Sequence, residues 1–175
     1  MFFRQWERGY DRPMIRQRAS VCIDAPAGAV WERLARLEDI QLWSEAVVAA
    51  SCPDGRSRGV GAERVCRLAG GVTIRERWLE WQEGSGFVYE GVGVPFVARA
   101  RNRWTVQPHG SRTMLISEAD VWLKGGLIGR LMSPLASRQI GRVASRTLAA
   151  FAYLVEHGEA PHVKHSRLPV PAPVC

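Results

Sequence analysis

Glu76 and Asn102 are the two polar side chains that a strand pattern directs toward an apolar interior. Val72 and Ile74 precede Glu76 at steps of two, and the twofold period of a strand places all three on one face. On the run from 97 to 107, the same period places Asn102 among apolar side chains. An unpaired carboxylate there could orient a ligand or act as a general acid or base. The alternatives for Glu76 are a buried pair with an arginine or backbone group and a hydrated position at a cavity mouth.

Aromatic side chains accompany these two positions and could stack on a planar or polycyclic ligand. Alternation places Trp78 on the face of Glu76, and Trp104 on the face of Asn102. Core packing is the competing explanation for at least half of the set, because aromatic residues dominate a core of this size. The candidate rings are Trp43, Trp78, Tyr89, Phe96 and Trp104.

The face opposite Asn102 carries Arg99, Arg101 and Arg103, which we expect to point into solvent, because burying three arginines in one cavity is costly. The last strand leaves two inward sets open, and we prefer the first because it buries fewer charges. The first set is Leu115, Ser117, Ala119 and Val121, and the second is Met114, Ile116, Glu118, Asp120 and Trp122.

Several kinds of site lack support. The four histidines do not fall at facing positions of a regular element, so we expect no metal and no histidine catalysis. No GxSxG elbow and no glycine-rich phosphate loop occur, and we expect no cofactor. The four cysteines form no CxxC pair. With no apolar leader and no apolar run of about 18 residues, the expectation is a cytoplasmic protein with free thiols.

The charge distribution gives expectations about partners. The 175-residue chain has a net charge of +7, and only Lys124 and Lys164 among its 24 basic residues are lysines. The arginines are scattered rather than clustered, so we expect no nucleic acid. Residues 1–17 alternate aromatic residues with arginines up to Pro13. Peripheral membrane contact through residues 1–12 is one interpretation. The favoured interpretation is that this segment packs on its own domain or on a second copy of the chain, and the protein is expected to be a monomer or a homodimer.

Hydrophobic periodicity predicts an α+β fold. A strand over 18–24 precedes a helix that Pro26 opens, with a second short helix over 37–43. Glycine- and proline-containing turns then separate strand-like runs at 46–52, 62–68, 72–82, 87–91, 97–107 and 113–123.

The last third changes to a helical period. A long amphipathic helix is expected from Gly126, with Pro134 either kinking it or starting its main segment, and with Gly158 as its stop. The proline-rich residues 159–175 are expected to be disordered. The predicted organisation is therefore an extension over 1–17, one domain over 18–158 and a tail.

These elements carry short motifs that resemble the START-like, or SRPBCC, superfamily and, within it, the polyketide cyclase/dehydrase-like group. The likeness covers about residues 18–157. The resemblance implies a helix-grip fold, in which a curved antiparallel sheet of about seven strands surrounds a long C-terminal helix, with two short helices after the first strand. The motifs are Ile23 to Pro26 leading to Val30-Trp31, then Trp43, Gly59 to Gly61, Glu80-Trp81, Gly110 to Leu115 and Leu131 to Leu135.

Such a fold commonly leaves a cavity under its helix, and the cavity, the resemblance and the aromatic and arginine residues of the N-terminal segment lead to three functional hypotheses. The first is a carrier or sensor of a hydrophobic small molecule, such as a lipid, quinone or polyketide-like compound. The second is a cyclase or dehydratase, for which Glu76 is the catalytic candidate, and the third is a membrane-docking or protein-interaction module. The residues expected to contact a ligand are Trp43, Val72, Ile74, Glu76, Trp78, Tyr89, Phe96, Asn102, Trp104, Leu131, Met132, Leu135, Val143 and Thr147.

Overall fold

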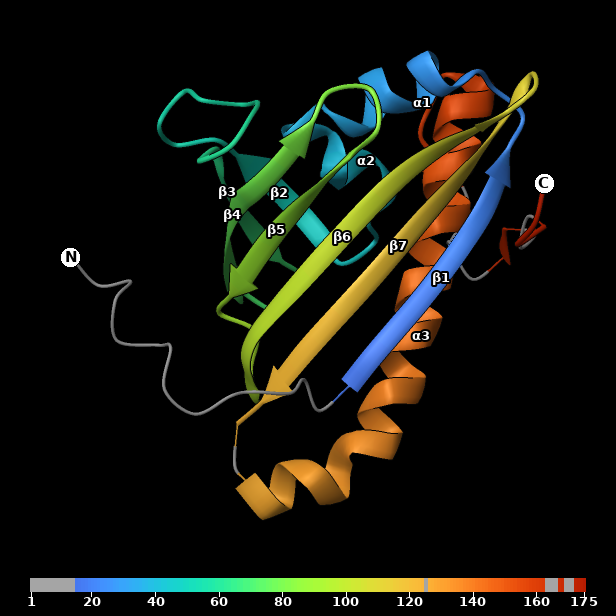
Figure 1. Cartoon of the computed structure of the whole chain (residues 1–175). Coiled ribbons are helices and arrows are strands. Elements are labelled where there is room, and N and C mark those ends of the chain that lie inside the picture. The colour runs from blue at the N-terminus through green and yellow to red at the C-terminus, as the bar shows by residue number, and fades with distance from the viewer. Residues whose placement is uncertain (1–14, 125, 163–166, 169–171) are drawn as a thin grey trace.

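A single antiparallel sheet of seven strands curves around one long helix (Figure 1). The computed structural model describes residues 15–124, 126–162, 167–168 and 172–175, and only the backbone of residues 126–133. The strand order is β1-β7-β6-β5-β4-β3-β2, so β1 and β2 form the two edges. The helix-grip architecture expected from the sequence is confirmed.

The strands follow the predicted runs closely. Each pairs antiparallel with its neighbours, and the turns between them fall at the expected glycines and prolines. The strands are β1 (Ile15–Ile23), β2 (Val47–Ser51), β3 (Glu63–Leu68), β4 (Thr73–Gln82), β5 (Gly86–Val92), β6 (Val97–His109) and β7 (Arg112–Leu123).

Two short helical segments lie between β1 and β2 and close one end of the sheet (Figure 1). In α1 (Ala27–Leu34), the buried residues Val30, Trp31 and Leu34 recur at helical spacing, and Pro26 precedes the first turn. The second segment consists of a 3-10 turn, η2 (Leu37–Asp39), followed by α2 (Ile40–Trp43). Both short helices therefore occur where the sequence predicts them.

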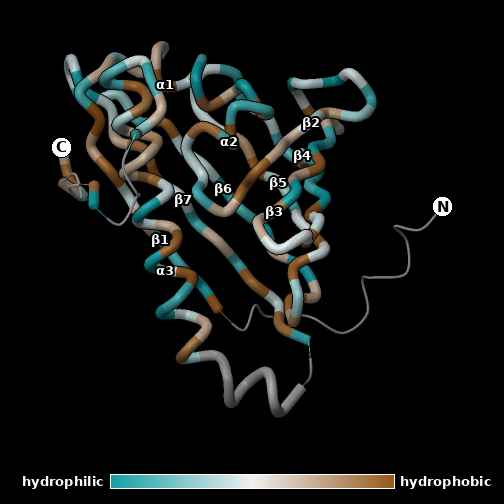
Figure 2. The backbone as a smooth tube through the Cα atoms, turned by 180° about the vertical axis from the view of Figure 1, so that it is seen from behind, coloured by the Kyte–Doolittle hydropathy of each residue, from teal (hydrophilic) through white to brown (hydrophobic). Residues whose placement is uncertain are grey.

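The long helix α3 (Gly126–His157) crosses the concave side of the sheet and runs alongside β1 and β7 (Figure 2). Pro134 lies inside α3, and the first turns of α3 run at an angle to the remainder (Figure 1). A proline removes one backbone hydrogen bond and clashes with the preceding turn, which accounts for a bend. The helix ends at Gly158, whose φ of 78° is the left-handed conformation typical of a helix stop.

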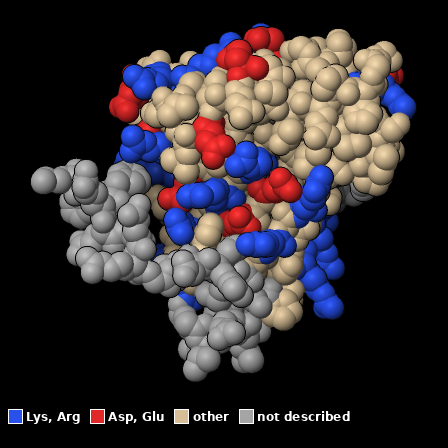
Figure 3. Space-filling model, viewed as in Figure 1, with Lys and Arg blue, Asp and Glu red and all other residues tan. Residues whose placement is uncertain are grey.

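The convex face of the sheet carries charged side chains of both signs (Figure 3). The strand register places Arg99, Arg101 and Arg103 on this face, as expected. Their partners are carboxylates on adjacent strands, with Arg99 3.2 Å and Arg101 3.6 Å from Glu90, and Arg103 3.3 Å from Glu80. Opposite charges on neighbouring strands stabilise the pairing modestly and keep this face hydrated.

The inward face of β7 is the one that the sequence favoured. Leu115 is fully buried in the main core, and Val121 belongs to a second apolar cluster under the helix. Trp122 faces the convex side but is nonetheless buried, because the Arg99 guanidinium lies 4.1 Å from the centre of its ring.

The described end of the tail differs from the predicted disorder. The Cys22 amide donates a hydrogen bond to the Ala172 carbonyl at 2.8 Å, and the Ser20 hydroxyl donates one to the Pro173 carbonyl at 2.8 Å. A disulfide joins Cys22 to Cys175. This pairing, which sequence spacing could not reveal, overturns the expectation of free thiols at these two positions.

The turn between β4 and β5 is tied to α1 through one carboxylate. Glu83 accepts hydrogen bonds from the indole N–H groups of Trp31 at 2.7 Å and Trp81 at 2.8 Å, and it lies 2.7 Å from Arg58. Hydrogen bonds from Trp81 and Trp31, with the charge of Arg58, lower the pKa of Glu83.

None of the helices among the described residues combines the length and the apolar composition that a membrane-spanning helix needs.

We expect removal of the Cys22–Cys175 disulfide to destabilise the fold by about 2–4 kcal/mol, because the bond closes a very long loop in the unfolded chain. Urea unfolding of a Cys22→Ser/Cys175→Ser variant measures the loss. Cys52→Ser is the matched control, since Cys52 has a free thiol in the structure. Four reactive thiols in the unreduced, denatured protein would contradict the disulfide.

Glu83 should make folding stability depend on acid pH. Its folded pKa lies below the ordinary 4.5, so the unfolded chain takes up the proton first as pH falls. The stabilisation is complete above pH 4.5 and disappears as pH falls through the folded pKa. Carboxyl NMR titration should give a pKa below 4.5 for Glu83, and Glu83→Gln should reduce the acid slope of the unfolding free energy. An ordinary pKa would contradict the bonding described.

Candidate functional site

A cleft of about 300 Å³ lies between the middle of α3 and the concave side of the sheet. Strands β5, β6 and β7 form its floor, α2 forms one wall and α3 forms its roof. Its lining residues are Ile40, Trp43, Ser44, Tyr89, Asn102, Trp104, Ser117, Ala119, Gln139, Ile140, Val143, Ala144 and Thr147.

The cleft exists because α3 is supported by apolar contacts on two sides of a stretch of small side chains. Toward its C-terminal end, α3 buries Phe151 in the main core. Nearer its N-terminal end, Ile140 packs against a separate cluster that contains Ile15 and Val121. Between these contacts, small side chains line the cleft from both the sheet and the helix, and their short reach leaves the space unfilled. These small residues are Ser117 and Ala119 on β7, and Ala144 and Thr147 on α3.

Three aromatic rings line the cleft next to the main core: Trp43, Tyr89 and Trp104. Trp43 contacts Trp104 at a ring-centroid distance of 5.7 Å and Phe151 at 5.2 Å, both edge to face. Trp78 lies outside the lining and stacks on Tyr89 at a ring-centroid distance of 4.9 Å. Edge-to-face and offset contacts of this kind are favourable and rigid. These aromatic rings join the cleft to the main core.

The structure gathers six of the predicted contact residues around the cleft. Asn102 lies on β6, between its register partners Tyr89 on β5 and Ala119 on β7. The six are Trp43, Tyr89, Asn102, Trp104, Val143 and Thr147.

Six other predicted residues lie elsewhere. Phe96 is 82% exposed in the loop after β5, with an unusual φ of 63°, and Leu135 is 65% exposed on α3. Trp78 is buried behind Tyr89, and Glu76 lies beside Arg64 on the concave side. Strand alternation fixes which face a side chain occupies, but not how far along that face the cleft extends. Val72 and Ile74 are half-buried and lie outside the cleft.

The side chains of Leu131 and Met132 lie outside the described part of the structure, as do residues 1–14 with the predicted membrane contact. Some cleft residues were absent from the expected contact set although the sequence held a signal for them. Ser117 and Ala119 belong to the preferred inward face of β7, and Ile140 belongs to the helical repeat of α3. Ser44 and Gln139 carried no such signal.

Glu76 forms a buried ion pair with Arg64, the structural alternative to a catalytic role. The Arg64 Nε atom lies 2.7 Å from the Glu76 carboxylate, and the side chains are 4% and 10% exposed. Arg64 also donates a hydrogen bond to the Leu37 carbonyl at 2.7 Å, and its guanidinium lies 5.0 Å from the centre of the Trp78 ring. The arginine partner was missed because strand alternation alone does not identify pairs between strands.

Electrostatics in this buried cluster favour the charged form of Arg64 and the neutral forms of Cys66 and Tyr89. Burial acts to lower the pKa of Arg64, but the Glu76 carboxylate outweighs it and the net pKa is raised. Burial raises the pKa of the Cys66 thiol to about 12 and also raises the pKa of the Tyr89 hydroxyl. Cys66 is therefore a protonated, unreactive thiol at neutral pH. Within the described residues, no three His, Cys, Asp or Glu side chains are placed to hold a metal ion.

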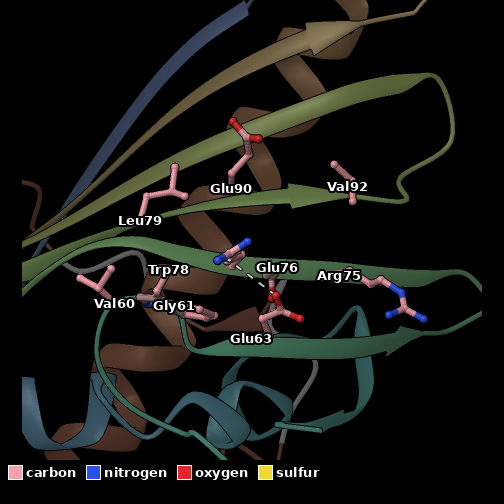
Figure 4. Close-up of a pocket in the computed structure, with 10 residues that line it drawn as sticks. Val60, Gly61, Glu63, Arg75, Glu76, Trp78, Leu79, Glu90 and Val92 are labelled. Atoms are coloured by element: carbon pink, nitrogen blue, oxygen red, sulfur yellow. Dashed lines mark ion pairs between the residues drawn. The ribbon is translucent and has the colours of Figure 1, made fainter. Parts of the chain in front are cut away.

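A second hollow, of about 400 Å³, lies on the convex face of β3, β4 and β5 (Figure 4). Exposed Val60, Leu79 and Val92 border it, and an ion pair between Arg77 and Glu63 at 3.9 Å crosses it. It has no helix above it and is part of the charged outer surface. The cleft beneath α3, with its buried aromatic wall, is therefore the candidate site.

A family model described as polyketide cyclase/dehydrase and lipid transport matches residues 14–156. No curated protein matches the chain. The residues matched include every described residue that lines the cleft.

Solved structures with the same fold accompany that match. A protein from Thermus thermophilus is 19% identical at a TM-score of 0.68, over 82% of this chain and 98% of that one. The ZhuI aromatase/cyclase from Streptomyces sp. R1128 is 18% identical at a TM-score of 0.64, over 81% and 93%. A START superfamily protein from Mycobacterium smegmatis is 14% identical at 0.62, over 76% and 93%. At these identities, the likeness shows the fold alone.

We expect Glu76→Gln to destabilise the fold by about 3–5 kcal/mol, because it leaves the Arg64 charge buried without its counter-ion. The matched control is Glu63→Gln in the exposed pair with Arg77, for which a loss below about 1 kcal/mol is expected. Urea unfolding measures both.

The double variant Arg64→Met/Glu76→Leu should recover part of the loss, because it removes both charges together. Equal losses for Glu76→Gln and Glu63→Gln would contradict the description of a buried pair.

Proposed function

Because the chain belongs to the polyketide cyclase/dehydrase and lipid transport family, we propose that it binds a hydrophobic small molecule in the cleft beneath α3 as a carrier or sensor. The observation that carries the proposal is the unfilled space between Trp104 on the sheet and Val143 on the helix. A lipid fragment, a quinone or a polyketide-like compound has the apolar body that this lining would accept.

The lining supports binding of an apolar body in a fixed orientation. Trp43 and Trp104 are rigid because both pack against Phe151, and a preorganised aromatic wall loses little entropy when a ligand stacks on it. The volume of about 300 Å³ is at the lower limit for small-molecule pockets, which are typically about 300–1,000 Å³. A compact ligand, or one segment of a longer chain, would fit this space.

The N-terminal half of α3 supports a route into the cleft. Leu135 in this half is 65% exposed and Val143 near the middle of the helix is 45% exposed, whereas Leu148, Phe151 and Leu154 in the C-terminal half are each at most 2% exposed. A segment with few buried apolar contacts opens at lower free energy than the core. Separation of Ile140 from its small cluster would admit a ligand while Phe151 keeps the C-terminal half anchored.

A cyclase or dehydratase activity is the alternative that family membership supports. Such catalysis requires an acid and a base that converge on the substrate. Glu76, the candidate for that role, pairs with Arg64 and does not line the cleft. Tyr89 is the one ionisable group among the described lining residues, and its raised pKa keeps the hydroxyl protonated at neutral pH, so it cannot accept a proton as a general base. The lining therefore favours binding over catalysis.

We expect Ala144→Trp to abolish ligand binding by filling the cleft from its roof. Native mass spectrometry of wild-type protein purified from its source cells should show an additional apolar mass that is absent from the variant. Arg146→Trp is the matched control, because Arg146 is exposed on the same helix and does not line the cleft. Retention of the same mass by Ala144→Trp would place the ligand elsewhere and contradict the proposal.

A further inference from the structure

Formal charge is absent from the described lining of the cleft. Among these residues, none is Lys, Arg, His, Asp or Glu. The Tyr89 hydroxyl stays protonated at neutral pH, because burial raises its pKa. Trp78 and Tyr89 stack on each other beside Arg64, and they separate the Arg64–Glu76 pair from the cleft. A charged ligand group in this space would lose hydration without gaining a counter-ion.

The floor of the cleft nevertheless offers a polar side chain in its middle. Asn102 is half-buried, and no side-chain hydrogen bond joins it to any residue that the structure describes. A side-chain amide can donate two hydrogen bonds and accept through its oxygen. If an apolar ligand covers this amide without hydrogen-bonding it, the lost hydration costs free energy of binding. A ligand that supplies a hydrogen-bond partner for the amide therefore binds more tightly. Asn102 is the one amide among the floor residues on β5, β6 and β7.

Resting on the proposed function, we infer that the ligand is an uncharged, largely apolar compound with a hydroxyl or carbonyl oxygen that hydrogen-bonds the Asn102 side chain. The aromatic wall of Trp43 and Trp104 would contact the apolar body, while Asn102 selects the oxygenated position. Anionic compounds of the same shape, such as carboxylates, would be rejected because the described lining holds no cation.

Three probes of one ring system separate these contributions: naphthalene, 2-naphthol and 2-naphthoate. Binding is followed at pH 7 by amide NMR of the full chain, including the side-chain NH2 signals of Asn102. We expect 2-naphthol to bind at least about tenfold more tightly than 2-naphthoate and to shift the Asn102 signals. Equal affinities for these two probes would overturn the inference.

Variants isolate the hydrogen bond. Asn102→Leu should weaken 2-naphthol binding by about fivefold to tenfold and leave naphthalene binding within about twofold. Gln107→Leu, at an exposed position of the same strand, is the matched control and should change neither. If Asn102→Leu weakens the binding of 2-naphthol and naphthalene equally, Asn102 contacts only the apolar body of the ligand. That result would overturn the proposed selection of an oxygen atom by Asn102.

The two proposals fail in different ways. Naphthalene binding that Ala144→Trp abolishes, without a preference for 2-naphthol over 2-naphthoate, would overturn the inference and leave the proposed function in place. Failure of all three probes to bind up to their solubility limits would contradict the proposed function. If Asn102→Leu does not fold, the comparison of the three probes on wild-type protein still decides the inference about charge.

Discussion

The packing of α3 against the sheet at two separate places is the constraint from which the rest of the molecule follows. Phe151, in the C-terminal half of the helix, packs against both Trp43 and Trp104, and Ile140 packs on a smaller cluster nearer its start. The helix is held above the sheet at these two contacts. Because Ser117 and Ala119 are short, their side chains do not fill the space between the contacts, and a cleft remains under the helix. The function proposed for this chain therefore depends on where large side chains are missing as much as on where they occur.

A second consequence of the aromatic layer is that charge and cleft are kept apart. The Arg64–Glu76 pair lies on the concave side of the sheet, where an isolated charge would be costly. Trp78 and Tyr89 cover that pair, and Tyr89 is also part of the cleft lining. The remaining cross-strand charges described here, such as Arg103 with Glu80, lie on the convex face. The interior thus combines a charged anchor with a neutral binding space.

Much of the fold could be predicted because its signals are local. Alternation in the strands gave the inward positions of Asn102 and Trp104, and a preference for burying fewer charges gave the inward face of β7. The site was harder to predict because it depends on distances between strands and helix. Alternation assigned Glu76 to the right face without showing that Arg64 would neutralise it. Phe96 was expected to contact the ligand but is exposed, because it lies in the loop between β5 and β6, where strand alternation does not fix the direction of a side chain.

An open sheet has two borders where backbone groups lack a neighbouring strand, and such borders invite pairing with other chains. At β1, the amide of Cys22 is already bonded to the carbonyl of Ala172, and the covalent link to Cys175 holds that segment in place. A second molecule approaching this border would meet a position that is occupied and cannot be vacated by simple displacement. Residues 172–175 therefore block the addition of another strand at this position of β1.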